Sequence, residues 1–451
     1  MERMTLEEIA RAVGCAGRFE GAVEEISTDS RRIPAGCLFV AIPGERFDGH
    51  DFVAKAAAAG ARWALVERPC DTGSIPPERV LTVPDARQAL VRIAGAYRAK
   101  FDLRCVGVTG SVGKTTTKDM VAEVLSAKYK TLKNEGNLNN EIGLPQTLFR
   151  LDGSFEAAVI EMGMQRLGEI AALAAAARPE LGVITSIGVS HIETLGSREN
   201  ILKAKLELAE ALPDGAPLLL CGDNDLLAAV RIPRLDVRFY GIDNPACALR
   251  AEGIAEEGGR TSFTLRHPGG SVRVAIPAVG RHNVCDALAA CGAGLALGIP
   301  AEECAAALGR YTPSGMRQRV VEHGGYTVVE DCYNASPDSM AAALATLGGW
   351  ACGGRRVAVL ADMLELGPIA REAHRQVGRL AAENGVDLLL CYGPLARGYA
   401  EGAAGVEAIC FDDKAALTEE LRRRLRPGDV VWVKGSHGMA LEEVLQGLYT
   451  A

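Results

Sequence analysis

The chain has 451 residues, of which 48% are hydrophobic and 24% are charged, with a formal net charge of −8 at pH 7. This is the composition of a globular protein of roughly two to four domains. The acidic balance argues against duplex nucleic acid as a partner, because a surface that neutralises phosphates must be basic.

The 13 cysteines are scattered without a C-x-x-C pair, which favours reduced, buried thiols over disulfides or a zinc site. The charged N-terminus, residues 1–8, lacks the apolar core of a signal peptide. The longest smooth apolar stretch, residues 287–299, is too short to span a bilayer. We therefore expect a cytoplasmic protein with no membrane insertion.

The first segment, residues 1–84, is predicted to mix short strands and helices. Strands are expected at 37–42 and 63–66, with a helix at 51–59. Two polar loops lie at 27–32 and 43–50. Because they carry Ser, Asp, Arg and His beside short strands, they are either binding loops or solvated turns.

A helix predicted at 85–100 leads to the segment 106–117, which reads V-G-V-T-G-S-V-G-K-T-T-T. An apolar strand, a glycine turn and the start of a helix form a phosphate cradle, in which backbone N–H groups and a lysine face the anion and a threonine hydroxyl holds Mg²⁺. The strict motif has glycine where this chain has Val108, so only the shorter G-x-x-G-K-T-T form is present. The residues predicted to bind the nucleotide here are Gly110, Ser111, Val112, Gly113, Lys114, Thr115 and Thr116.

Strands predicted at 157–161, 181–187 and 217–221 alternate with helices, which indicates a mainly parallel sheet. The shorter runs that follow suggest an added antiparallel patch before a helix at 284–297. Those runs are 237–240, 262–265 and 272–276.

The turn at 311–315 is predicted to be a hinge into a second α/β unit. Strands are expected there at 326–329, 357–360, 386–391 and 430–433.

Two polar side chains follow predicted strands of the central segment. Glu161 ends a buried strand, where ligands of open α/β sheets bind, so it is placed to bind Mg²⁺ directly or through water. Alternatively it caps a helix or lies at the surface. His191 also lies just past a strand end. It is either a ligand or a structural histidine.

Lys205 falls on the apolar stripe of a helix predicted at 199–212, whereas Lys203, Glu207 and Glu210 fall on the opposite, solvated face. A lysine in that position must extend to solvent, find an anion or change its chemistry. Burial lowers the pKa of an amine, and a neutral amine can react with CO₂ to give a carbamate that binds metal. Extension to solvent is the alternative.

Further polar clusters are candidates for a polar substrate. Residues 134–143 are rich in asparagine, which suits sugar and phosphate groups, and Asn283 could simply cap the helix that follows it. Asp331, the 362–367 loop and the 434–438 loop all follow predicted strands of the last unit. Three polar loops at one sheet edge predict a binding face.

Together these residues resemble the Mur ligases of peptidoglycan synthesis, over nearly the whole chain. The motifs that carry the resemblance are D-S-R, G-E-R-F-D-G-H, T-G-S-V-G-K-T-T-T, N-L-N-N-E-I-G, E-M-G-M, G-V-S-H-I-E-T-L-G-S-R-E-N, A-K-L-E, G-R-H-N, D-C-Y-N-A-S-P-D-S-M and A-D-M-L-E-L-G. N-L-N-N-E-I-G and the last two motifs favour the family member that joins D-alanyl-D-alanine to UDP-N-acetylmuramoyl-tripeptide through an acyl phosphate.

The resemblance implies a three-domain α/β fold. Residues 1–84 would bind the UDP substrate, 85–312 would form the ATP-binding domain with a mainly parallel sheet, and 313–451 would form a Rossmann-like ligase domain. It also implies ATP and two Mg²⁺ ions as cofactors. We expect a monomer.

The resemblance also implies individual roles. Thr115 and Glu161 would bind the first Mg²⁺, and His191 and a carbamylated Lys205 the second, with Lys114 acting on the phosphates. The remaining implied contacts are Asn283, Arg317 and Asp331 with ATP, Asp362, Lys434 and Ser436 with the dipeptide, and Ser30, Arg31, Asn139 and Asn140 with the UDP substrate.

Two kinds of alternative function stay open. One is another amide ligase, either a different Mur ligase or an enzyme like folylpolyglutamate synthetase, which shares the central domain. The other is a regulatory ATPase with a phosphate loop and no ligase chemistry.

Overall fold

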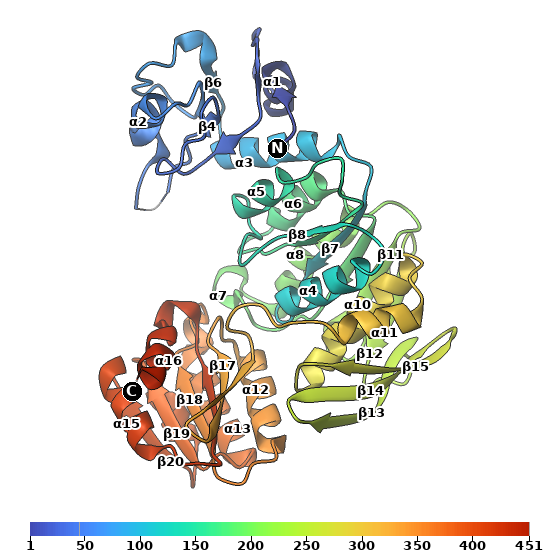
Figure 1. Ribbon diagram of the computed structural model, residues 1–451, viewed down its shortest axis with the longest axis vertical. Coiled ribbons are helices and arrows are strands. Elements are labelled where there is room, and N and C mark those ends of the chain that lie inside the picture. Colours follow the sequence, from blue (N-terminus) through green and yellow to red (C-terminus); the bar gives the residue numbers. More distant parts are fainter. Residues whose placement is uncertain (45, 451) are drawn as a thin grey trace. The chain divides into compact units, whose positions relative to one another are not determined.

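The structure is a computed structural model that describes residues 1–44 and 46–450 (Figure 1). Glu45, in the second of the two polar loops, lies outside the described residues. The chain divides into two compact units. The first contains Met1–Val108, Tyr129–Gly182 and Leu206–Ala216, and the second contains the other described residues.

The N-terminal part of the first unit is built on a small parallel sheet of order β3-β4-β5-β6. All four residues of β5 are buried, as the apolar run predicted, and the strand predicted at 37–42 is confirmed by β4. The elements of this part are β1 (Met4–Thr5), α1 (Leu6–Val13), β2 (Ala22–Val23), β3 (Ile26–Ser27), β4 (Leu38–Val40), η1 (Gly49–Phe52), α2 (Val53–Ala58), β5 (Trp63–Val66), η2 (Pro77–Arg79) and β6 (Val80–Thr82).

The middle of the chain forms a sheet of nine strands, in the order β15-β14-β13-β12-β11-β10-β7-β9-β8. In the first unit β9 pairs in parallel with both β7 and β8. The elements from residue 86 to 210 are α3 (Ala86–Arg98), β7 (Arg104–Thr109), α4 (Lys114–Leu125), β8 (Thr131–Lys133), α5 (Gly143–Leu148), β9 (Ala157–Glu161), α6 (Glu169–Ala177), β10 (Leu181–Ile184), α7 (Ile192–Leu195) and α8 (Arg198–Glu210).

The second unit carries the remaining strands of that sheet. The elements from residue 217 to 308 are β11 (Pro217–Cys221), α9 (Asp225–Ala228), β12 (Asp236–Gly241), β13 (Leu249–Glu257), β14 (Arg260–His267), β15 (Gly270–Ile276), α10 (Arg281–Ala296) and α11 (Ala301–Leu308). Strands β13, β14 and β15 are antiparallel, as expected for 262–265 and 272–276.

The expectation of an antiparallel strand at 237–240 is wrong, because β12 pairs in parallel with β11 and with β13. The chain crosses through α9 between β11 and β12, and such a crossover returns the next strand in the same direction.

The C-terminal sheet has the order β16-β17-β21-β18-β19-β20 and is parallel except for β16. The strands predicted at 326–329, 357–360, 386–391 and 430–433 are confirmed. The elements of this part are β16 (Arg319–His323), β17 (Tyr326–Asp331), α12 (Pro337–Gly349), β18 (Arg356–Ala361), η3 (Gly367–Ile369), α13 (Ala370–Glu383), β19 (Leu388–Tyr392), α14 (Arg397–Gly402), β20 (Glu407–Phe411), α15 (Lys414–Arg424), β21 (Val430–Lys434), η4 (His437–Met439) and α16 (Glu442–Tyr449).

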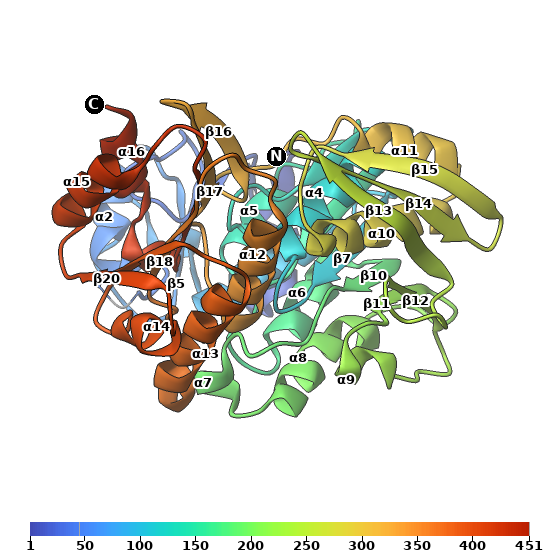
Figure 2. The same cartoon turned by 90° about the horizontal axis from the view of Figure 1, so that it is seen from below.

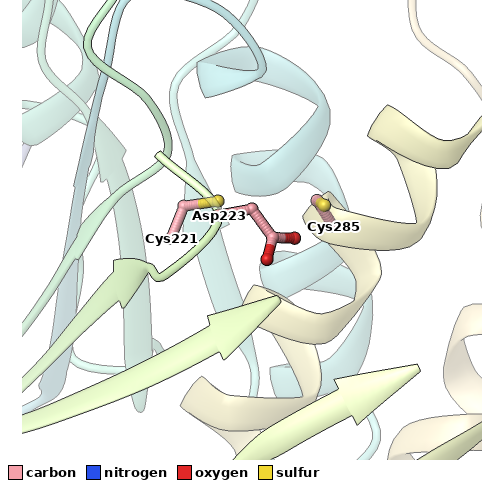
Figure 3. A group of neighbouring side chains, drawn as sticks. All are labelled: Cys221, Asp223 and Cys285. Atoms are coloured by element: carbon pink, nitrogen blue, oxygen red, sulfur yellow. The ribbon is translucent and has the colours of Figure 1, made fainter. Parts of the chain in front are cut away.

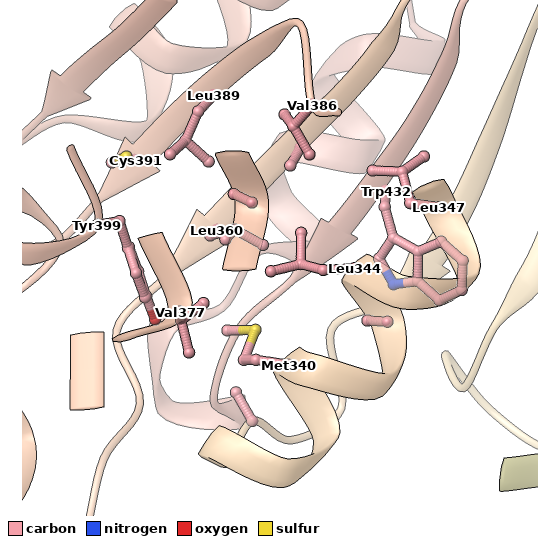
Figure 4. Packing of buried hydrophobic residues seen from close by; sticks show 14 of the residues in the cluster. Met340, Leu344, Leu347, Leu360, Val377, Val386, Leu389, Cys391, Tyr399 and Trp432 are labelled. Carbon is pink, nitrogen blue, oxygen red and sulfur yellow. The ribbon is translucent and has the colours of Figure 1, made fainter. Parts of the chain in front are cut away.

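Helices cover both faces of this C-terminal sheet, with α12 and α13 on one side and α15 and α16 on the other (Figure 2). Successive residues of a strand alternate between the two cores, since Ala358 and Leu360 pack toward α12 and α13 whereas Val357 and Val359 pack toward α15 and α16. Figure 4 shows the first of these cores, with Trp432 beside Leu347 of α12. The predicted α/β class with mainly parallel sheets is thereby confirmed.

In the described part of the chain, every helix is too short or too polar to cross a bilayer.

Candidate functional site

The loop between β7 and α4 has the backbone that a phosphate cradle requires. Gly110 has φ 151° and Gly113 has φ 87°. A Cβ at Gly110 would lie 1.8 Å from Thr185 Oγ1, and a Cβ at Gly113 would lie 2.6 Å from Asp286 Oδ1. Both positions therefore need glycine for conformation and for space.

The chain after β10 holds the same loop in place. The Gly188 N–H donates to Ser111 Oγ at 2.9 Å, and the Val112 N–H donates to Ser186 Oγ at 3.0 Å. No side chain caps the N-terminus of α4, whose N-cap is Gly113. The helix dipole at this N-terminus favours an anion.

Lys114 is folded back over this loop. Its Nζ donates to Gly110 O at 2.8 Å and to Ser111 O at 3.2 Å. Thr115 follows it and is only 6% exposed. The loop thus places an ammonium group and a hydroxyl at the start of α4, as the sequence predicted.

Lys205 is fully enclosed, with 1% of its surface exposed. Burial, together with the nearby charge of Lys114, holds the pKa of the Lys205 amine well below its usual value. The alternative that its ammonium extends to solvent is therefore wrong. A neutral buried amine is the chemical form that reacts with CO₂.

Glu207 is buried, so the prediction from the helical period that it lies on the solvated face is wrong. It is 8% exposed, and its carboxylate accepts from the Gly168 N–H at 2.7 Å and the Ala171 N–H at 3.0 Å. These groups begin α6, so Glu207 caps that helix and compensates its dipole.

Glu161 is the last residue of β9 and is 2% exposed. Asn139 Nδ2 donates to Glu161 Oε1 at 2.8 Å, and Asn134 Oδ1 accepts from the Glu161 N–H at 2.9 Å. The asparagine-rich segment therefore orients this carboxylate. Asn140 has a local role as well, because its Oδ1 accepts from the N–H groups of Ile142 and Gly143 at the start of α5.

His191 contacts a residue that the sequence analysis did not single out. Its Nδ1 lies 2.9 Å from Glu365 Oε2, and the hydrogen bond from His191 lowers the pKa of the Glu365 carboxyl. Both residues have left-handed backbones, with φ 63° and 62°, a conformation that costs energy in residues other than glycine. Glu365 lies in the A-D-M-L-E-L-G motif, which is the sequence feature that could have identified it.

The polar loops of the C-terminal sheet meet at one edge, as predicted. Strands β17, β21 and β18 are neighbours and end at Asp331, Lys434 and Ala361. Lys434 Nζ lies 2.8 Å from Asp331 Oδ2, and the Ser436 N–H donates to Asp362 O at 3.2 Å. The fold thus brings Asp331, which the resemblance assigns to ATP, next to Lys434, which it assigns to the dipeptide.

The pair Lys434–Asp331 is a buried ion pair, so its removal should be costly. Lys434→Met would leave the Asp331 carboxylate with the Trp432 indole N–H and no cation. We expect a loss of about 3 kcal/mol or more in the free energy of unfolding, measured by urea denaturation. Lys414→Met, which breaks a pair between half-buried Lys414 and exposed Glu443, should cost less than about 1 kcal/mol. Equal losses for the two variants would contradict the burial argument.

Asn283 is not a helix cap. Helix α10 begins earlier, with Gly280 as N-cap. Asn283 Nδ2 donates to Gln318 Oε1 at 2.7 Å and to Val279 O at 2.6 Å. Arg317, next to Gln318, places its guanidinium 3.7 Å from the centre of the Tyr333 ring.

Ser30 and Arg31 lie in the loop after β3. The Arg31 side chain is exposed and bonds to Asp29, with Nε 2.9 Å from Asp29 Oδ1. That hydrogen bond lowers the pKa of the Asp29 carboxyl to about 2. The guanidinium therefore stays within its own turn.

Asp286, which the sequence analysis did not select, lies under the phosphate loop. Thr117 Oγ1 donates to Asp286 Oδ1 at 2.7 Å. Burial raises the pKa of the Asp286 carboxyl from 3.8 to about 7, against the opposing effect of that hydrogen bond.

The shifted Asp286 predicts a pH dependence of stability. Between pH 3.8 and about 7 the folded state keeps a proton that the unfolded state has lost, so stability falls as pH rises through this window. Asp286→Asn should remove this contribution and flatten the fall, measured as unfolding free energy against pH. Asp225→Asn changes an aspartate whose pKa Arg198 lowers and should leave the fall in place. An unchanged slope in Asp286→Asn would refute the assignment.

Three family models match the chain. They are the Mur ligase middle domain over residues 108–294, the Mur ligase glutamate ligase domain over 316–437, and the Mur ligase family catalytic domain over 22–98. A relative from Bacillus subtilis named UDP-N-acetylmuramoyl-tripeptide–D-alanyl-D-alanine ligase is 38% identical, with 94% of this chain and 93% of the relative covered.

Solved structures agree with these matches. MurF from Acinetobacter baumannii has a TM-score of 0.93 and 30% identity over 100% of both chains. MurF from Thermotoga maritima, in complex with ADP, has a TM-score of 0.86 and 27% identity over 94% of this chain and 97% of that one. The chain therefore belongs to the Mur ligase family.

Proposed function

We propose that this chain joins D-alanyl-D-alanine to UDP-N-acetylmuramoyl-tripeptide in an ATP-dependent reaction of peptidoglycan synthesis. The observation that carries the proposal is near-full-length identity of 38% with a relative bearing that name. The phosphate loop with Lys114 and the buried Lys205 supply the chemistry that such a reaction needs. We further propose that the protein works in the cytoplasm as a monomer.

The reaction must activate a carboxylate, because a carboxylate repels nucleophiles and hydroxide is a poor leaving group. The terminal carboxylate of the tripeptide takes the γ-phosphoryl group of ATP, ADP leaves, and an acyl phosphate forms. The free amine of D-alanyl-D-alanine then attacks the acyl carbon and forms the C–N bond. The C–O bond to the phosphate breaks, its electron pair leaves with inorganic phosphate, and the nitrogen loses a proton.

This chain's own groups would serve the first step through charge and position. The N–H groups at the start of α4 bind phosphate oxygens, and Lys114 exchanges its loop carbonyl partners for the outer phosphates. In this proposal Asn283 contacts the adenine of ATP, and Arg317 and Asp331 contact its ribose or its phosphates. Ser111, Gly110, Val112, Gly113 and Thr116 complete the loop.

The groups implied for Mg²⁺ have suitable donor chemistry. Glu161 is a buried carboxylate oriented by Asn139, and Thr115 offers a buried hydroxyl. We assign these two residues to one ion, and His191 with a carbamylated Lys205 to a second. When bound, Mg²⁺ neutralises charge on the transferring phosphoryl group.

The proposed substrate contacts follow the family resemblance. Residues 1–84, 85–312 and 313–451 would be the UDP-substrate, ATP and ligase domains, and each range contains one of the sheets described above. Asp362, Lys434 and Ser436 would bind the dipeptide, and Ser30, Arg31, Asn139 and Asn140 the UDP substrate.

One assay tests the proposal against its alternatives. ADP release should require both UDP-N-acetylmuramoyl-tripeptide and D-alanyl-D-alanine, and the product should be the pentapeptide. Release with a shorter UDP-peptide and a single amino acid would indicate another Mur ligase. Dependence on folate would indicate a folylpolyglutamate synthetase, and phosphate release without any amine a regulatory ATPase.

A further inference from the structure

Sulfur and carboxylate ligands that the proposed reaction does not use converge at the carboxyl end of β11. Cys221 ends that strand, Asp223 lies two residues further on, and Cys285 comes from α10. One ligand atom from each lies within 4.8 Å of the other two. In Figure 3 the Asp223 carboxylate and the Cys221 sulfur, both from the end of β11, lie on the side of the helix that carries the Cys285 sulfur.

We propose that Cys221, Asp223 and Cys285 bind a divalent cation that prefers thiolate ligands, of which Zn²⁺ is the representative. The spacing of the cysteines alone predicts no zinc site. Cys221 and Cys285 are 64 residues apart in the sequence, and the fold brings them together. The inference is independent of the ligase activity proposed above.

The donor set selects the class of ion. Thiolates favour Zn²⁺ and Cd²⁺, whereas Mg²⁺ requires oxygen ligands in an octahedral arrangement. A tetrahedral zinc ion with Zn–S bonds of about 2.3 Å holds its sulfur ligands slightly under about 4 Å apart. The three ligand atoms of this group lie within 4.8 Å of one another, close to the separation that such an ion requires.

The Asp223 carboxylate is already oriented by the backbone. Its Oδ1 accepts from the N–H groups of Asp243 at 3.1 Å and Asn244 at 2.8 Å, and its Oδ2 accepts from the Ile242 N–H at 2.6 Å. Two carboxylate oxygens offer about four acceptor positions, so Oδ2 keeps one lone pair for an ion. Such hydrogen bonds fix a metal ligand before the metal arrives.

The surroundings permit an ion to enter and leave a fourth position to solvent. Asp223 is exposed and Cys285 is half-buried, whereas Cys221 is 7% exposed. A third thiol, Cys247, packs against the turn between the ligands, where a Cβ on Gly222 would lie 2.4 Å from its sulfur. It lies outside the group of three.

Binding would have two consequences. The two thiols each lose a proton to solvent when they ligate the ion, so affinity should fall as pH is lowered. The ion would also link the end of β11 to α10, so it should raise the unfolding temperature of the native protein.

The test uses the full-length protein, reduced and freed of metal with a chelator. Cd²⁺ should give an ultraviolet thiolate-to-metal charge-transfer band that saturates at one equivalent. Zn²⁺ should compete for the same site, measured against a chromogenic chelator. Cys285→Ser should lose the band and bind Zn²⁺ at least about 100-fold more weakly.

A matched control is available in β20. Cys410 is exposed and stands opposite Cys391 of β19, so it belongs to a second pair of adjacent thiols. Cys410→Ser should leave the band, the Zn²⁺ affinity and the metal-induced thermal shift unchanged.

Each other result overturns the proposal. No saturable band in the wild type, a band that survives Cys285→Ser, or a band lost in Cys410→Ser would each do so. If Cys285→Ser does not fold by circular dichroism, Cys221→Ser replaces the sulfur on the other element and must give the same loss.

Discussion

Lys114→Ala is expected to lower the rate of ADP release by at least about 1,000-fold, because it removes the one loop side chain that brings a full positive charge to the phosphates. Lys114 bonds to the carbonyl oxygens of Gly110 and Ser111. Its ammonium group is therefore already positioned within the loop. Loss of this charge should affect phosphoryl transfer far more than binding of the nucleoside.

The same substitution should leave the fold intact. Lys114 is half-buried, and its carbonyl partners can bond to water once the side chain is gone. The measurement pairs steady-state ADP release with the thermal unfolding temperature. Lys128→Ala, an exposed lysine shortly after the same helix, should change neither quantity. Wild-type activity in Lys114→Ala would refute the assignment of the phosphate loop.

Buried strands were the part of the fold that sequence could predict well. The runs 63–66, 157–161 and 217–221 are apolar except for Glu161 at the end of the second, and β5, β9 and β11 match them residue for residue. Exposure of such a run to water raises the free energy whatever its neighbours are, so its tendency to be buried can be read from the local sequence. The direction of β12 is not local, because it depends on how the chain crosses between strands.

Strands without a continuous buried apolar run could not be found in this way. Strand β20 has no fully buried residue, and most of β13 beyond its start is exposed or half-buried. β13 also contains Gly253 and a register shift between Glu252 and Ala255. These strands are specified by their neighbours' hydrogen bonds, and the sequence pattern carries little of that information.

The candidate site shows the same limit at the level of single residues. The period of α8 placed Lys205 correctly, since an apolar stripe marks the buried face. The same period predicted that Glu207 is exposed to solvent. In the structure its carboxylate accepts hydrogen bonds from the N–H groups at the start of α6. The contacts His191–Glu365 and Asp331–Lys434 join segments more than 100 residues apart, so only the folded chain reveals them.

Lys205→Ala is expected to reduce ADP release by about 100- to 1,000-fold, and short carboxylic acids added to the assay should restore part of the loss. The reason lies in the surroundings of the amine. Burial and the charge of Lys114 disfavour an ammonium at this position, whereas a carbamate would be attracted by Lys114. A small carboxylate can occupy the space left by the shortened side chain and supply the same negative charge.

Removal of CO₂ should also slow the wild type, and bicarbonate should restore it, because the carbamate forms reversibly on the neutral amine. Lys203→Ala is the matched control, since Lys203 is exposed on the same helix. It should keep full activity and respond to neither treatment. If Lys205→Ala loses activity without rescue while the wild type is indifferent to CO₂, then Lys205 acts as an amine, and the second Mg²⁺ site must be assigned to other residues.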